Sequence, residues 1–220
     1  MSTRAGVFRF LAYAVLVGGV SLVTAEAARR LPAAGMVQID ELIAEIQLVL
    51  LFLCAGVFGW VALRDRLRRP LAIAFMAVFG FGLIRESQDF LDRLVTDNFW
   101  QASAALLLAV ASVYLFRHRA RLVAGWQRSW PSAGLAILLA GLILTIFFVP
   151  VLFAPDFWRT VLGEGYTRRT VRLLADVATL GTYLLLLVGS LEFLYAWSRL
   201  PQTREMDRPR RRRAARKRRR

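Results

Sequence analysis

The sequence predicts an all-α membrane protein, a bundle of six transmembrane helices joined by short loops. Two properties of the whole chain support this prediction, because 57% of its 220 residues are hydrophobic and its mean hydropathy is +0.49. The third observation is the pattern, since the apolar residues form six blocks, most of them about twenty residues long. A helix needs that length to cross the hydrocarbon core, whereas membrane barrels use alternating segments of about ten residues.

We expect the spans at residues 5–25, 42–63, 71–91, 99–116, 133–154 and 171–197. The first block begins near Arg9, and residues 23–25 resemble a signal-peptide cleavage site, so a cleaved signal peptide is the alternative there. The third block has only 14 apolar residues before Arg85, so its helix must carry charged residues into the membrane. The fifth contains Pro150, which predicts either a kink or the end of the helix.

The basic charge is concentrated at the C-terminus, which divides residues 1–199, the membrane domain, from residues 200–220, an Arg-rich tail. The formal net charge is +15, and residues 199–220 hold 12 of the 30 Lys and Arg residues. Residues 208–220 have too little apolar content to fold, so we expect a disordered tail that touches anionic lipid headgroups. Because the tail has no aromatic residue for base stacking, we expect no specific nucleic acid partner.

Arginines in the short loops predict the orientation. They follow the second and fourth spans at Arg64, Arg66, Arg68, Arg69, Arg117, Arg119, Arg121 and Arg128. With six spans these loops and the tail fall on one side, and the positive-inside rule assigns that side to the cytoplasm. Both termini are then cytoplasmic. Arg accounts for all but one of the 30 basic residues, a bias typical of GC-rich bacteria, so we expect a bacterial inner membrane.

Charged residues that the spans cannot avoid form the candidate site. The second, third and sixth spans begin or end on the outer side, and each carries charges in that layer. These residues are Glu45, Arg85, Glu86, Asp89, Arg172 and Asp176, with Glu192 separate in the inner half of the last span. On a continuous helix, residues four apart share a face, as do Arg85 with Asp89 and Arg172 with Asp176.

Two interpretations of this cluster stay open. Ionisable residues inside a membrane are costly, so they suggest a functional site that binds a polar ligand or relays protons. The alternative is an interhelical salt-bridge network near the interface, in a non-catalytic scaffold or complex subunit with a membrane protein partner. Both interpretations depend on contact between the second, third and sixth spans.

The chain offers few residues for a cofactor. His118 is its one His and Cys54 its one Cys, so we expect no zinc or haem site and no cofactor. A carboxylate-metal enzyme acting on lipid-linked substrates is a further alternative, with oxygen ligands from Glu41, Glu45, Glu86 and Asp89. The sequence has no nucleophile motif, phosphate-binding loop or dinucleotide fingerprint, and we do not expect an enzyme.

Two short stretches resemble a family of bacterial multi-pass membrane proteins. They are residues 83–92 (LIRESQDFLD), followed by residues 99–101 (FWQ), and residues 189–195 (GSLEFLY) in the last span. The resemblance implies a bundle of six or seven helices and no assigned activity.

Overall fold

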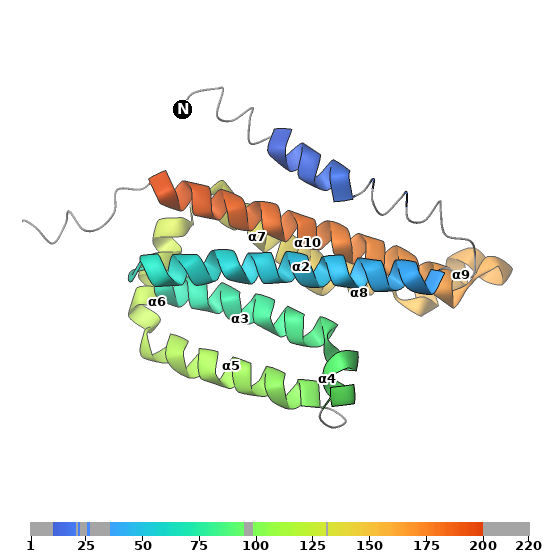
Figure 1. The fold of residues 1–220 in the computed structure, drawn as a ribbon, viewed down its shortest axis with the longest axis horizontal. Coiled ribbons are helices and arrows are strands. Elements are labelled where there is room, and N and C mark those ends of the chain that lie inside the picture. Colours follow the sequence, from blue (N-terminus) through green and yellow to red (C-terminus); the bar gives the residue numbers. More distant parts are fainter. Residues whose placement is uncertain are drawn as a thin grey trace, which may run out of the picture.

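The computed structural model describes residues 11–20, 22, 26, 36–94, 99–130 and 132–199. Every element within these residues is a helix, which confirms the all-α prediction for this part of the chain (Figure 1). Among the described residues, four helices are long and apolar enough to cross a membrane, namely Glu41–Arg64, Phe99–Arg117, Ala133–Val151 and Val171–Trp197. Of the first predicted span, the structure describes mainly the short apolar helix Leu11–Val20. The tail predicted for residues 200–220 lies outside the described residues.

The helices follow one another with short connections. Their bounds are α2 Met36–Arg64, α3 Arg69–Glu86, α4 Gln88–Leu94, α5 Phe99–Arg117, α6 Arg119–Ser129, α7 Ala133–Ile143, η2 Leu144–Phe148, α8 Val149–Leu152, α9 Pro155–Leu162, η3 Gly163–Gly165 and α10 Arg168–Arg199. Short connections make successive long helices antiparallel neighbours.

The long helices lie side by side, with α2 near the middle. It packs against both α3 and α10, while α5 packs against α3 and α7 packs against α10 (Figure 1). One end of the bundle, which we call the α9 end, holds α4, α9 and the starts of α2 and α10. The opposite α6 end holds α6 with the end of α2 and the start of α3.

The apolar core centres on Phe58 of α2, whose side chain is fully buried. Its ring centroid lies 4.8 Å from that of Phe75 and 5.7 Å from that of Phe79, both on α3. The ring of Phe193 on α10 is 5.4 Å away. Stacked and tilted rings at these distances attract one another beyond simple burial, so Phe58 joins the second, third and sixth predicted spans.

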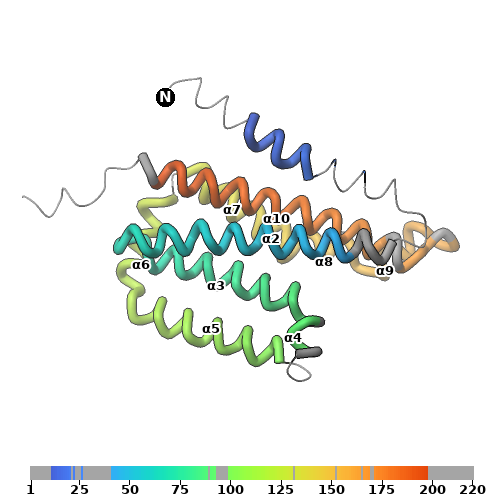
Figure 2. Tube along the Cα trace, viewed as in Figure 1, coloured from blue at the N-terminus to red at the C-terminus, as the bar shows by residue number. Residues whose placement is uncertain are grey.

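The helix of the third span is interrupted. α3 ends at Glu86, Ser87 lies outside both helices, and α4 turns aside toward α5 (Figure 2). The sequence explains this interruption, because residues 85–89 include no apolar residue that could continue the buried face of α3. α3 also contains three charged residues, Arg69, Arg85 and Glu86, so it is less apolar than the four long helices named above.

The fifth span changes its winding before Pro150. Residues Leu144–Phe148 form a π-helix in which the N–H of Val149 bonds to the carbonyl of Leu144. Proline has no N–H and its ring crowds the preceding turn, and a locally wider helix relieves that crowding. The chain then continues as α8 to Leu152, so Pro150 does not itself end the helix.

Glycines allow α7 and α10 to approach each other closely. A Cβ atom added to Gly134 would overlap the backbone of Phe193, and one added to Gly189 would lie 2.9 Å from the backbone nitrogen of Leu138. Small residues at such crossings let helix backbones pack directly in membranes, where dispersion replaces the hydrophobic effect between helices.

Candidate functional site

The predicted site residues other than Glu192 lie on the start of α2, the end of α3, α4 and the start of α10. Helix α2 packs against both α3 and α10, so the three spans that carry these residues are neighbours (Figure 1). The side chains of Glu45, Arg85 and Arg172 are nevertheless exposed. The side chain of Asp89 lies outside the described residues.

Glu86 is half-buried and bonds to a different helix. The phenol of Tyr183 on α10 donates a 2.8 Å hydrogen bond to Glu86 Oε1 at the end of α3. Tyr183 itself is buried. A hydrogen bond to a carboxylate is stronger than one between neutral groups, so this contact holds α3 against α10.

Gln47 makes the corresponding link between α2 and α10. Its side chain is only 4% exposed, and its Nε2 donates a 2.9 Å hydrogen bond to the backbone carbonyl of Asp176. Asp176 is half-buried at this point of α10. The sequence places Gln47 on the second span, but no local pattern indicates a backbone carbonyl as its partner.

Two further hydrogen bonds connect α10 to other helices, through Glu192 and Thr182. Tyr13, on the helix Leu11–Val20, donates a 2.9 Å hydrogen bond from its phenol to Glu192 Oε1. Thr145, in the π-helical segment, donates to the hydroxyl of Thr182 at 2.9 Å. Polar side chains on α10 therefore face several neighbouring helices rather than one common cavity.

The described part of the chain contains no cluster of side chains suited to bind a metal ion. Within it, no three His, Cys, Asp or Glu side chains lie close enough together to hold a metal ion. Of the four predicted oxygen ligands, this finding covers Glu41, Glu45 and Glu86, because the side chain of Asp89 lies outside the described residues.

The α6 end holds a polar junction that sequence reasoning missed. Asp65 Oδ1 accepts hydrogen bonds from the backbone N–H groups of Leu67 and Arg68, at 2.9 and 3.3 Å. Its Oδ2 accepts a 3.0 Å hydrogen bond from the indole nitrogen of Trp197. A lone acid among arginines just before the Arg69-Pro70 helix start was the available signal, because Asp commonly binds free N–H groups there.

Arg68 is the most deeply buried charged residue of this junction, at 3% exposure. Burial lowers the pKa of its guanidinium, the charge of Asp65 raises it, and the charge of Arg128 lowers it again. Gly125 of α6 packs directly on the chain here, since a Cβ at this position would lie 3.6 Å from the Cα of Arg68.

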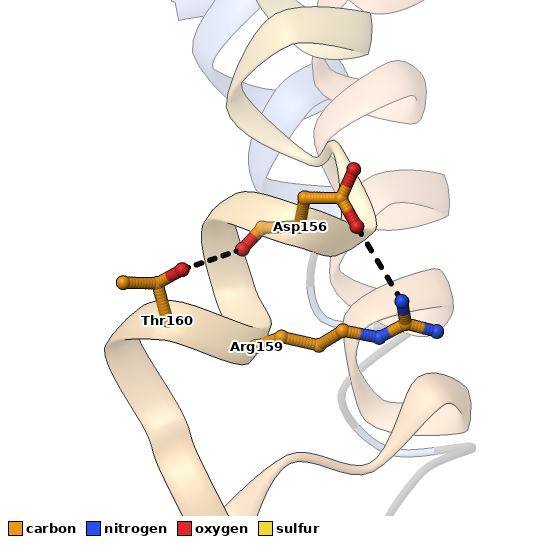
Figure 3. A network of polar contacts seen from close by, with 3 residues as sticks. All are labelled: Asp156, Arg159 and Thr160. Carbon is orange, nitrogen blue, oxygen red and sulfur yellow. Dashed lines mark hydrogen bonds and ion pairs between the residues drawn. The ribbon is translucent and has the colours of Figure 1, made fainter.

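The ion pair on α9 lies at the surface. It belongs neither to the predicted site residues nor to the junction around Asp65 and Arg68. Arg159 Nη1 lies 3.4 Å from Asp156 Oδ1, and Thr160 donates a 2.9 Å hydrogen bond to the carbonyl of Asp156 (Figure 3). The Arg159 and Asp156 side chains are 61% and 93% exposed. Such a pair contributes little to stability, because water screens both charges.

Comparison with known proteins identifies no relative of this chain. No protein family matches the chain, and no curated protein or solved structure is significantly similar to it.

Proposed function

We propose that this chain is a non-catalytic integral membrane protein, a scaffold or a subunit of a larger membrane complex. One observation carries the proposal: Gln47, Glu86 and Glu192 each form a hydrogen bond with another helix. The polar groups of the spans then serve to fix the arrangement of the helices.

The exposure of the remaining charges supports the same interpretation. A polar ligand site in a protein usually has a few side chains that converge on one concave pocket. Here Glu45, Arg85 and Arg172 extend into the surroundings of the bundle, while Glu86 already accepts a bond from Tyr183. Hydrogen bonds between membrane helices contribute about 0.6 kcal/mol each on average, so several of them stabilise one arrangement of helices appreciably.

The proposed topology has six spans, with both termini on the cytoplasmic side of a bacterial inner membrane. The helix Leu11–Val20 belongs to the first span and α3 to the third, where α3 lies between α2 and α5. Arg64, Arg66, Arg119 and Arg121 all lie at the α6 end, which supports a cytoplasmic assignment of that end. The Arg-rich tail would then meet anionic lipid headgroups on the same side.

Proton movement or polar-ligand binding through Glu86 is the second candidate function. The specific observation that favours it is a half-buried carboxylate within hydrogen-bond distance of a phenol, next to the exposed Arg85. Carboxylates of membrane helices form proton relays in pumps and transporters.

The size of the protein in its native membrane tests the scaffold proposal. A tagged copy, solubilised in a mild detergent, is separated by native electrophoresis beside the same protein purified to homogeneity. The proposal predicts that the native-membrane sample migrates well above the purified 24.8 kDa chain in its micelle. Equal migration of the two samples, after chemical cross-linking in the intact membrane, would count against a complex subunit.

Proteoliposomes distinguish the second candidate. The purified protein is reconstituted with a trapped pH-sensitive dye, and a pH gradient is imposed with and without a membrane potential. The scaffold proposal predicts the same proton flux for the wild type and Glu86→Gln, at the level of empty liposomes. A flux that the wild type supports and Glu86→Gln abolishes would establish the proton-relay function instead.

A further inference from the structure

At the contact between α3 and α6, two polar atoms are buried with no hydrogen-bond partner among the residues that the structure describes. They are Nε of Arg68, at the start of α3, and Oγ of Ser129, at the end of α6. Both residues are only 3% exposed. Buried polar groups in native proteins nearly always have a partner, so two unsatisfied ones at the same helix contact need an explanation.

The packing of α6 brings these two residues to the same junction. Gly125 touches the carbonyl of Leu67 and the Cα of Arg68, at 3.4 and 3.6 Å from the position a Cβ would take. Ser129 lies four residues later on α6, and residues four apart share a helix face. The Ser129 side chain therefore lies on the face of α6 that packs against α3.

The neighbouring acid does not neutralise Arg68 by direct contact. Both oxygens of Asp65 already accept hydrogen bonds, Oδ1 from the Leu67 and Arg68 N–H groups and Oδ2 from the Trp197 indole. Arg128 adds a second positive charge, which contributes to the lowered pKa of Arg68. Arg128 is itself half-buried.

We propose that the junction between α3 and α6 binds a phosphate-bearing anion through Arg68, Arg128 and Ser129. Two guanidinium groups and a hydroxyl match the chemistry of phosphate, which offers several strong acceptor oxygens and a negative charge. The phosphate of an anionic phospholipid and free inorganic phosphate both have this chemistry.

Ligand-dependent thermal stability of the full chain tests the proposal. The purified protein in nonionic detergent is heated with increasing dihexanoyl-phosphatidylglycerol, dihexanoyl-phosphatidylcholine or sodium phosphate, while tryptophan fluorescence reports unfolding. Binding to the folded state stabilises it by RT ln(1 + [L]/Kd), so Tm rises with the logarithm of ligand concentration once that concentration exceeds Kd. A rise with phosphatidylglycerol alone identifies a lipid headgroup, and a rise with sodium phosphate identifies the free anion.

Matched variants connect any rise to this junction. Arg128→Gln should raise the half-maximal ligand concentration about tenfold, the effect of one lost charge-assisted hydrogen bond. Ser129→Ala should weaken binding in the same direction, and it leaves both charges in place if Arg128→Gln fails to fold. Arg121→Gln, at an exposed position of the same helix, removes an equal charge and should leave the affinity unchanged.

Two outcomes would overturn the proposal. One is the absence of any stabilisation by phosphatidylglycerol or sodium phosphate beyond that given by phosphatidylcholine. The other is equal loss of affinity in Arg121→Gln and Arg128→Gln, which would show that the anion responds to general surface charge.

Discussion

Tyr183 on α10 donates a 2.8 Å hydrogen bond to Glu86 on α3, a residue 97 positions away in the sequence. The bond joins two helices that both pack against α2. It therefore constrains the positions of three helices, together with the ring contacts that Phe58 makes to α3 and α10.

Removing the phenol hydroxyl should destabilise this arrangement. Tyr183→Phe keeps the ring but leaves the half-buried Glu86 without its donor, so we expect a loss of about 0.5 to 2 kcal/mol in unfolding free energy. Thermal unfolding in detergent measures the effect. Tyr166→Phe is the control, because the buried Tyr166 hydroxyl has no hydrogen-bond partner and its removal should be neutral. Equal Tm values for the two variants would contradict the structural role.

Gln47 should be important for a similar reason. Gln47→Met keeps the length and volume of the side chain but removes the donor to the Asp176 carbonyl, so we expect a loss of about 0.5 to 1.5 kcal/mol. Gln101→Met, at an exposed position of α5, should leave the unfolding free energy unchanged. Chemical denaturation of the two variants measures the effect, and a Gln47→Met variant as stable as the wild type would contradict the prediction.

The close crossing of α7 and α10 gives a third prediction. Gly189→Ala places a methyl group 2.9 Å from the Leu138 nitrogen, so the two helices must separate and the protein should lose at least about 1 kcal/mol. Gly181→Ala lies on the same helix with open space around it, and helix propensity predicts a gain of up to about 1 kcal/mol. Opposite shifts in Tm are the expected result, and shifts of the same sign and size would refute the packing argument.

Asp65 and Asp156, two of the acids outside the spans, should differ in their contribution to stability. Asp65→Ala removes an acceptor that serves two backbone N–H groups and the Trp197 indole, and we expect a loss of about 1 to 2 kcal/mol. Asp156→Ala breaks only the exposed pair with Arg159 and should cost less than about 1 kcal/mol. Chemical denaturation of both variants measures the two losses of unfolding free energy. A larger loss for Asp156→Ala than for Asp65→Ala would contradict the prediction.

Hydropathy predicts the membrane character of the chain because the bilayer fixes the length of apolar sequence that a helix needs. It cannot reveal the choice of polar partners. Glu86 was a predicted site residue, but its donor Tyr183 depends on the rotation of α10 against α3, which packing of many apolar side chains determines. Likewise, the i,i+4 relation of Arg85 and Asp89 assumed one continuous helix, whereas α3 ends at Glu86.

Asp65 shows a different limit. Sequence reasoning treated the loop after the second span as a source of positive charge, so the one acid among its arginines received no role. Its importance comes from Trp197, which α10 brings back to the same end of the bundle 132 residues later. Only the tertiary arrangement connects these two residues.

A double-mutant cycle on Glu86 and Tyr183 tests the central claim, that intramembrane polar residues of this protein join its helices. Unfolding free energies of Glu86→Ala, Tyr183→Phe and the double variant give the coupling between the two side chains, with Glu86→Gln as the variant that keeps an acceptor oxygen. We expect a favourable coupling of about 0.5 to 2 kcal/mol and near-normal stability for Glu86→Gln. Zero coupling, with full stability retained in Glu86→Ala, would contradict it.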